Sequence, residues 1–239
     1  MTRVILTLSI ITVMGVTSLQ AVPTTYTGTL SVTGAGADGA LLAAGDWNDP
    51  ASTLAWTVDN TTTPGKWHYE YTLSVPTGAI SHMIVEVSDD DPGPIFLLAN
   101  LFDPQSAPTG WIDDPIELDE FQAGQQGGNP NMPENVYGVK FNAEDTFDET
   151  TVMIAFDSDR VPVWGDFYAK GGGDNTLYNA GFTAPDSDPA DPPADGSIDS
   201  HVLVPDSTTV LVPVPGGVLM GSVGVVLVGW LRQRRSLGF

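Results

Sequence analysis

The clearest pattern in the chain is the alternation of apolar and polar residues in two neighbouring segments. Between Ala51 and Asn60, Leu54, Trp56 and Val58 share one face. Between Lys66 and Val75 the alternation resumes, with one face carrying Trp67, Tyr69, Tyr71, Leu73 and Val75. A Pro-Gly turn lies between the two segments. A period of two, with aromatic and β-branched residues on both sides of a turn, predicts a β-hairpin.

Further short segments have a similar pattern and are also predicted to be strands: Tyr26–Thr33, Ala79–Val87, Ile95–Phe102, Val136–Phe141, Thr150–Asp157, Val161–Tyr168 and Leu177–Phe182. The polar residues from Asp157 to Arg160 predict a turn, which would make the flanking strands a second hairpin. Residues 34–45 read as a loop, and residues 103–133 as a functional loop or a poorly ordered insertion. The pattern predicts an all-β fold over residues 22–184, an antiparallel β-sandwich of jelly-roll or Ig-like type.

The first 21 residues have the organisation of a secretory signal peptide. Arg3 supplies the positive end, residues 4–16 form the apolar core, and Ala21 is the expected last residue before cleavage. The sequence therefore predicts an exported protein whose body lies outside the cytoplasm.

The last thirty residues, 210–239, combine a Pro-containing motif, an apolar run and a basic end. A bilayer core takes about 20 apolar residues of helix. The run from Gly217 to Leu231 approaches that length when residues 214–216 are added, so a membrane helix is expected over residues 214–231. Arg232, Arg234 and Arg235 follow it and are expected to stop the chain on the cytoplasmic side.

These three parts together resemble the PEP-CTERM sorting signal of exported bacterial proteins. The motif here is Val212-Pro213-Val214-Pro215-Gly216, with Val214 where the family usually has glutamate. The resemblance implies an exosortase-type membrane peptidase as partner, cleavage near the motif, and release or transfer to the cell surface. The alternative is a tail that stays as a permanent anchor.

The body also resembles uncharacterised PEP-CTERM proteins, to which no activity is assigned. The resemblance covers roughly residues 56–182, through the segments Phe156–Gly172, Ile80–Ser88 and Val136–Phe141.

Charge and composition restrict the function further. All 30 acidic residues lie between Asp38 and Asp206, where only Lys66, Lys140, Arg160 and Lys170 oppose them. Such a body is not expected to bind nucleic acid or an anionic membrane surface. The charge favours either plain solubility or the binding of cations, and the absence of cysteine excludes disulfides. Residues 185–209, rich in Asp, Pro, Ala and Ser, are expected to be an extended tether.

Few residues suggest chemistry. His82 and Glu86 share a strand face about 13 Å apart, too far to hold one ion alone, and His68 with Glu70 has a similar limitation. We expect both pairs on solvated sheet faces. No nucleophile, zinc or nucleotide motif is present, and His201, in the expected tether, completes no triad.

Three further features are candidates. Asp89, Asp90 and Asp91 form an acidic turn that is a candidate calcium site, to which Asp157, Asp159 and Asp166 are an alternative. Arg160 is expected to form a salt bridge within the second hairpin. Trp164 and Tyr168 would stack on a sugar if exposed, or fill the core.

Together these features predict an exported surface or extracellular-matrix protein without catalytic activity. A carbohydrate-binding module of the cell surface, with extracellular polysaccharide as its partner, is the alternative. A hydrolase with a carboxylate pair is a third hypothesis. No cofactor is expected apart from the candidate calcium ion.

Overall fold

The structure of the chain is a computed structural model that describes residues 22–34, 36–87, 96–124, 128–183 and 191–210. The chain divides into two compact units, of which the one considered below runs from Val22 to Leu211. The other comprises residues 1–21 and 212–239. The expected signal peptide, sorting motif, membrane helix and basic stop therefore lie outside the described residues. No helix within the described ranges is long and apolar enough to cross a membrane.

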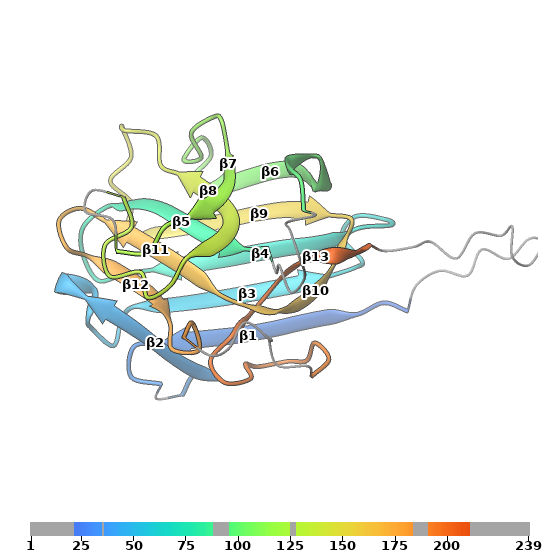
Figure 1. Cartoon of the computed structure of the whole chain (residues 1–239), viewed down its shortest axis with the longest axis horizontal. Helices are drawn as coiled ribbons and strands as arrows, with labels where there is room; N and C mark the ends of the chain where they lie inside the picture. Colours follow the sequence, from blue (N-terminus) through green and yellow to red (C-terminus); the bar gives the residue numbers. More distant parts are fainter. Residues whose placement is uncertain (1–21, 35, 88–95, 125–127, 184–190, 211–239) are drawn as a thin grey trace, which may run out of the picture. The chain divides into compact units, whose positions relative to one another are not determined.

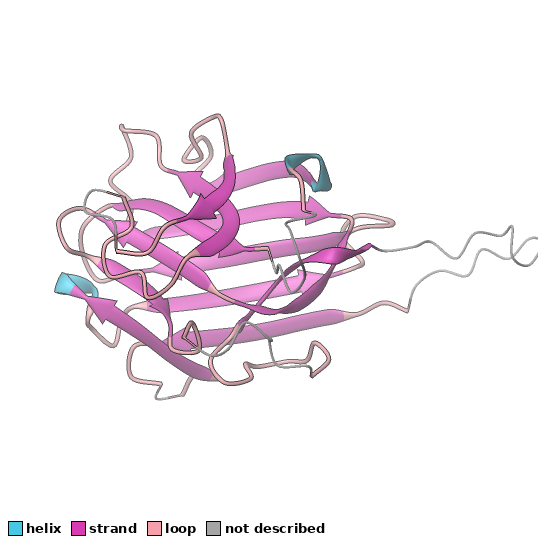
Figure 2. Cartoon of the chain, in the orientation of Figure 1, coloured by secondary structure: helices cyan, strands magenta, loops and turns pink. Residues whose placement is uncertain are grey.

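The described residues form strands joined by turns, with two single-turn 3-10 helices (Figure 1). The first strands are β1 (Thr25–Ser31), β2 (Gly39–Ala44), β3 (Thr53–Asp59), β4 (Trp67–Ser74), β5 (Ile80–Glu86), β6 (Leu101–Ala107) and β7 (Glu117–Phe121). The later ones are β8 (Val136–Asn142), β9 (Thr151–Ser158), β10 (Arg160–Gly165), β11 (Phe167–Gly171), β12 (Thr176–Asn179) and β13 (Val202–Val210). The helices are η1 (Gly45–Trp47) and η2 (Leu98–Asn100). The prediction of an all-β fold is confirmed (Figure 2).

Eleven strands belong to one continuous sheet, in the order β6-β9-β4-β3-β1-β2-β12-β11-β5-β8-β7. Within this order only β1 and β2 pair in parallel, through Leu30↔Gly39 and Ser31↔Ala40. This short pairing joins two antiparallel halves, one ending at β6 and the other at β7. The sheet curls, so apolar residues of both halves share one core.

The predicted hairpin of β3 and β4 is confirmed. The two strands pair antiparallel from Thr53↔Ser74 to Asp59↔His68. Asp59 fixes the turn, because its carboxylate accepts hydrogen bonds from the backbone N–H and the hydroxyl of both Thr61 and Thr62. Burial alone would raise the pKa of Asp59, but these hydrogen bonds outweigh it and hold the pKa below its usual value.

Aromatic rings connect the two halves across the core. The Phe156 ring of β9 stacks on Tyr69 of β4 with centroids 5.4 Å apart, and on Phe141 of β8 at 5.7 Å. Since β8 belongs to the other half of the sheet, this ring holds the curled halves together. Trp47, Trp111 and Trp164 are also fully buried in the described core.

A separate two-stranded ribbon, β10 with β13, completes the core. The hydroxyl of Tyr69 donates to the carbonyl of Arg160 at 2.9 Å, and that of Tyr71 donates to the carbonyl of Leu203 at 2.7 Å. These bonds fasten both strands of the ribbon to β4. The predicted hairpin of β9 and β10 is wrong, because β10 pairs with β13 whereas β9 pairs with β4 and β6.

The expected tether over residues 185–209 is also wrong where the structure describes it. Val202, Leu203 and Val204 are completely buried in β13. The segment before them is bound to β1, since Gly196 N–H donates to Thr27 O at 2.7 Å. The Asp- and Pro-rich composition predicted a solvated chain, but these three apolar residues favour a core strand. The β domain therefore extends past residue 184 to β13.

Other parts of the chain are more ordered than the pattern predicted. Residues 34–45 include β2, and the predicted loop 103–133 contains most of β6 and all of β7. A second apolar cluster forms on the outer face of the β7 half, from Ile84, Phe121, Met132, Val136, Tyr168 and Phe182. The predicted loop supplies Phe121 and Met132, so it covers a face that was expected to be solvated.

Gly28 of β1 offers a test of this packing. A Cβ at Gly28 would overlap the buried Trp56 ring and lie 2.7 Å from the carbonyl oxygen of Gly196. Gly28→Ala should therefore reduce the free energy of unfolding by about 3 kcal/mol, because the Trp56 ring is buried and Gly196 is backbone that is hydrogen-bonded to β1. Gly172→Ala is the control: a Cβ there would meet nothing within 4 Å, and the change should stay within about 0.5 kcal/mol. Equal urea midpoints for the two variants would contradict the packing.

Candidate functional site

The candidate sugar-stacking residues lie inside the domain. Trp164 is 1% exposed and Tyr168 is completely buried. The Tyr168 hydroxyl donates to the carbonyl of Pro130 at 2.7 Å, so it holds the 128–135 segment over the sheet. Neither ring is available to a carbohydrate.

His82 is buried, although a solvated position was expected. Its Nε2 lies 3.2 Å from Oδ1 of Asn129, and its ring lies 5.9 Å from that of Tyr168. Burial lowers the pKa of His82 to about 3, and the nearby ammonium groups of Lys140 and Lys170 contribute in the same direction. His82 is therefore a neutral core residue at physiological pH. Glu86, which lies on the same strand, belongs to a second polar site near Asp166.

Glu86 belongs to a polar network where β10 leads into β11. Its Oε2 accepts a hydrogen bond from the backbone N–H of Asp166 at 2.7 Å. The Asp166 carboxylate accepts one from Nδ2 of Asn179 at 2.6 Å, and it lies 3.8 Å from Nε2 of His201. The network brings together two carboxylates, an amide and an imidazole from β5, the β10–β11 junction, β12 and the residue before β13.

This network joins ionisable and amide side chains through hydrogen bonds and a close contact. The side chains of this network also bind backbone groups. Asn179 Oδ1 accepts a hydrogen bond from the N–H of Phe167 at 3.0 Å, and His201 Nδ1 lies 3.1 Å from the carbonyl oxygen of Ile198. Asn179 and His201 are buried. The geometry therefore fixes the lead-in to β13 against β11 and β12. Sequence analysis missed it because His201 was placed in a tether.

His68 has a simpler partner. Its Nδ1 lies 2.8 Å from Oδ1 of Asp157, directly across the β4–β9 ladder. Glu70 lies opposite Ala155 on the same ladder. His68 therefore pairs with Asp157 on the neighbouring strand and not with Glu70 on its own strand. The spacing of residues within one strand could not predict this partner.

Arg160 binds three segments rather than closing a hairpin. It is 5% exposed, and its guanidinium donates to the carbonyl of Ser207 at 2.7 Å and to Oδ1 of Asn100 at 3.1 Å. The Arg160 Nε lies 3.5 Å from Oδ1 of Asp159. Asn100 in turn donates to the Asp159 carboxylate at 3.1 Å. The expected pair with Asp159 is present, but the main role of Arg160 is to join η2, β10 and β13.

The calcium candidates are dispersed. Asp89, Asp90 and Asp91 lie outside the described residues, so that site stays a prediction. Asp157, Asp159 and Asp166 contact His68, Arg160 and His201 respectively. Within the described ranges no three His, Asp or Glu side chains are grouped so that they could hold a metal ion.

Comparison with known protein families, with curated proteins and with solved structures found no match for this chain.

The buried His82 predicts a specific loss of stability in acid. An unfolded histidine titrates near pH 6.5, whereas folded His82 titrates near 3. Unfolding therefore takes up a proton between these values, and stability falls as the pH falls through this window, by about 1.4 kcal/mol per unit. When the pH is lowered from 7.5 to 4.5, the free energy of unfolding should fall in both proteins. The fall should be about 2.5 kcal/mol smaller in His82→Gln than in the unaltered protein, as measured by urea unfolding. Parallel pH profiles for the two proteins would contradict a buried, neutral His82.

The Arg160 contacts predict that lysine cannot replace this residue. A lysine ammonium cannot span Ser207, Asn100 and Asp159 with the same geometry. Arg160→Lys should thus lower the free energy of unfolding by about 3 kcal/mol. The reciprocal control is Lys140→Arg, where the ammonium lies 3.5 Å from the exposed Glu117 carboxylate. Its effect should stay within about 0.5 kcal/mol, and equal losses in the two variants would refute the role of Arg160.

Proposed function

We propose that the chain is an exported protein of the cell surface or extracellular matrix, without catalytic activity, whose β domain is delivered by its C-terminal signal. The observation that carries the proposal is the order of three parts in residues 210–239. These are the Val212–Gly216 motif, the apolar run, and the arginines Arg232, Arg234 and Arg235. An exosortase-type membrane peptidase is the proposed partner.

The start of the domain supports cleavage after Ala21. Asn60 holds the chain immediately after that position, since its Oδ1 accepts the N–H of Thr24 at 2.9 Å and its Nδ2 donates to the carbonyl of Val22 at 3.0 Å. β1 then begins at Thr25. A chain that begins at Val22 would keep all of these contacts.

The polar residues of the domain support a binding or structural role over catalysis. His68, His82 and His201 each contact a side chain on another strand or segment, and these contacts join elements of the fold. We also propose that the curled sheet is a β-sandwich of the jelly-roll or Ig-like kind, because its two halves face each other across one core.

The two ligand hypotheses have different support. A carbohydrate-binding module would need residues other than Trp164 and Tyr168, both of which are buried. Calcium binding at Asp89–Asp91 is compatible with the acidic composition and is part of the proposal for the matrix role.

The signal predicts a defined mature protein. Produced in cells that contain an exosortase-type peptidase, the chain should have a mass that corresponds to a start at Val22 and an end near residues 212–216. Pro213→Ala with Pro215→Ala should block processing, because it removes the motif and leaves the apolar run unchanged.

Ser222→Ala, within the run itself, is the matched control and should be processed normally. Intact-mass measurement distinguishes these outcomes. A mature chain that still ends at Phe239 would overturn the sorting proposal and leave a permanent anchor.

A further inference from the structure

Both ends of the described domain lie at one end of the sheet. Thr25 at the start of β1 pairs with Asp59, which pairs with His68, which pairs with Asp157. Arg160 follows shortly after Asp157 and pairs with Val210, the last residue of β13. Figure 1 shows β1 beginning and β13 ending on the same side. We name this side the tail end, formed by residues 22–25, the turn 60–66, η2 with Leu97, residues 158–160 and the close of β13.

The expected membrane helix begins only a few residues after β13. Val210 ends the strand and the span is expected from Val214, so four extended steps cover at most about 14 Å. The polar headgroup layer takes about 6 Å of this distance on each side of a bilayer. If the tail enters a membrane as proposed, the connection from Val210 to the hydrocarbon core is therefore short, and only about 8 Å of it lies outside the headgroup layer.

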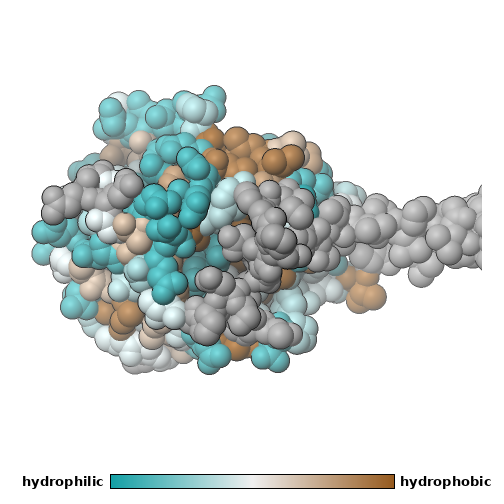
Figure 3. Space-filling model, viewed as in Figure 1, coloured by the Kyte–Doolittle hydropathy of each residue, from teal (hydrophilic) through white to brown (hydrophobic). Residues whose placement is uncertain are grey.

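The tail end also carries most of the exposed large apolar side chains of the described domain. Val22 is 78% exposed, Leu97 59% and Leu98 45%, and only Leu42, at 47% on β2, lies elsewhere. Figure 3 shows an apolar group over the region of η2 and β6. Tyr26, which is partly exposed, stacks nearby on the buried Trp67 ring with centroids 6.0 Å apart. Tyrosine is favoured at the boundary between lipid and water, and Tyr26 is the more exposed of the two rings.

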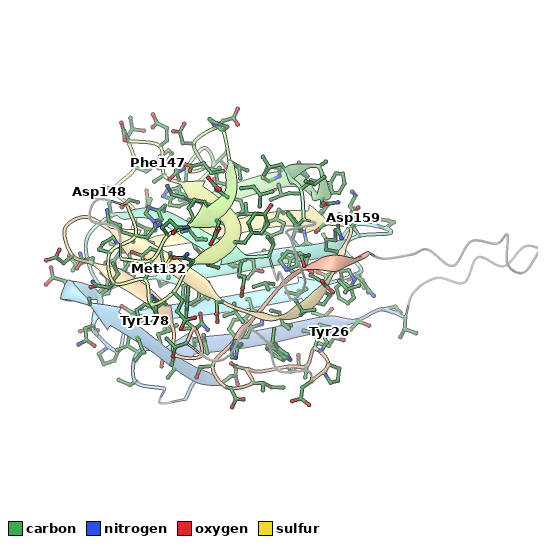
Figure 4. All side chains as sticks on the ribbon, viewed as in Figure 1. Tyr26, Met132, Phe147, Asp148, Asp159 and Tyr178 are labelled. Atoms are coloured by element: carbon green, nitrogen blue, oxygen red, sulfur yellow. The ribbon has the colours of Figure 1, made fainter. Side chains whose placement is uncertain are left out.

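The end of the sheet opposite the tail end, here called the far end, is the more acidic of the two ends. The turns at the far end carry nine carboxylates and no basic residue: Asp46, Asp49, Asp113, Asp114, Glu144, Asp145, Asp148, Glu149 and Asp174. At the tail end, Lys66 lies over the Phe102 ring, and Asp59, Asp157 and Asp159 are engaged by the Thr61–Thr62 turn, His68 and Arg160. Asp103 beside Phe102 is exposed, and Asp206 lies in β13. Figure 4 shows Tyr26 and Asp159 on the tail side and Asp148 on the opposite side. Asp89–Asp91 lie outside the described residues and enter neither group.

We infer that the tail end of the domain docks on the lipid surface of the membrane that its C-terminal segment enters. The inference rests on the proposed function, because it requires the tail in a bilayer. Leu97, Leu98 and Val22 would lie among the headgroups, and the acidic far end would face away from the membrane. The protein would then be held in a fixed orientation until its tail is cleaved.

The absence of cysteine makes this orientation directly measurable. Leu98→Cys at the tail end and Asp148→Cys at the far end each accept a single fluorophore. The full chain is reconstituted in phosphatidylcholine vesicles that contain a headgroup spin-labelled lipid. Docking predicts strong quenching at position 98 and none at position 148. Equal quenching at both positions in vesicle-bound chain would overturn the docking surface and leave the sorting proposal intact.

A second measurement tests the leucines themselves. With the fluorophore at Thr63→Cys in the tail-end turn, Leu97→Ser combined with Leu98→Ser should reduce quenching. Leu42→Ser, on β2, is the matched control and should leave it unchanged. Unchanged quenching in the double variant would refute docking through η2. If the unaltered chain fails to sediment with the vesicles at all, the proposed membrane tail fails, and the docking surface fails with it.

Discussion

The pairing of β13 with β10 is the interaction on which the closure of this domain depends. A curled sheet buries its apolar residues only if the space between its halves is filled, and β13 supplies Val202, Leu203 and Val204 to that space. The Tyr71 hydroxyl and the Arg160 guanidinium bind the carbonyls of Leu203 and Ser207. These contacts satisfy backbone groups that would otherwise be costly to bury. The last described strand is thus part of the core and not an accessory to it.

The sequence predicted several local strands because alternation reports directly on burial. Two predictions were wrong: Ile95–Phe102 holds η2 and only the first two residues of β6, and Val161–Tyr168 spans β10 and β11, which belong to different sheets. The β3–β4 hairpin followed from Trp56, Tyr69 and Tyr71 in period two, and all three are buried. Pairing between distant strands could not be predicted in this way. β10 looked like the partner of β9 because the two are adjacent in sequence, yet its partner lies about forty residues further on. Alternation indicates which face of a strand is buried, but it carries no information about which strand lies alongside.

The candidate site shows the same limit for polar residues. His82 lies on a strand face that the pattern reads as solvated, yet a distant segment covers that face through Met132 and places Asn129 beside the imidazole. Asp166, Asn179 and His201 meet because the junction of β10 and β11, the end of β12 and the residue before β13 converge. Composition alone suggested that the residues before β13 were solvent-exposed, and it hid the apolar triplet within them. Residues whose surroundings come from elsewhere in the chain are those that a single sequence cannot place.

The position of β13 at the end of the folded unit has a kinetic consequence. A chain that crosses a membrane from its N-terminus delivers β10 well before β13, and the core stays incomplete in the interval. Contacts of such long sequence separation form slowly, since the intervening chain must first be ordered. If the chain is exported as proposed, the domain would therefore remain incompletely folded during most of its translocation. It would complete its core only when nearly all of the chain before the tail has crossed, so that completed transport and completed folding coincide.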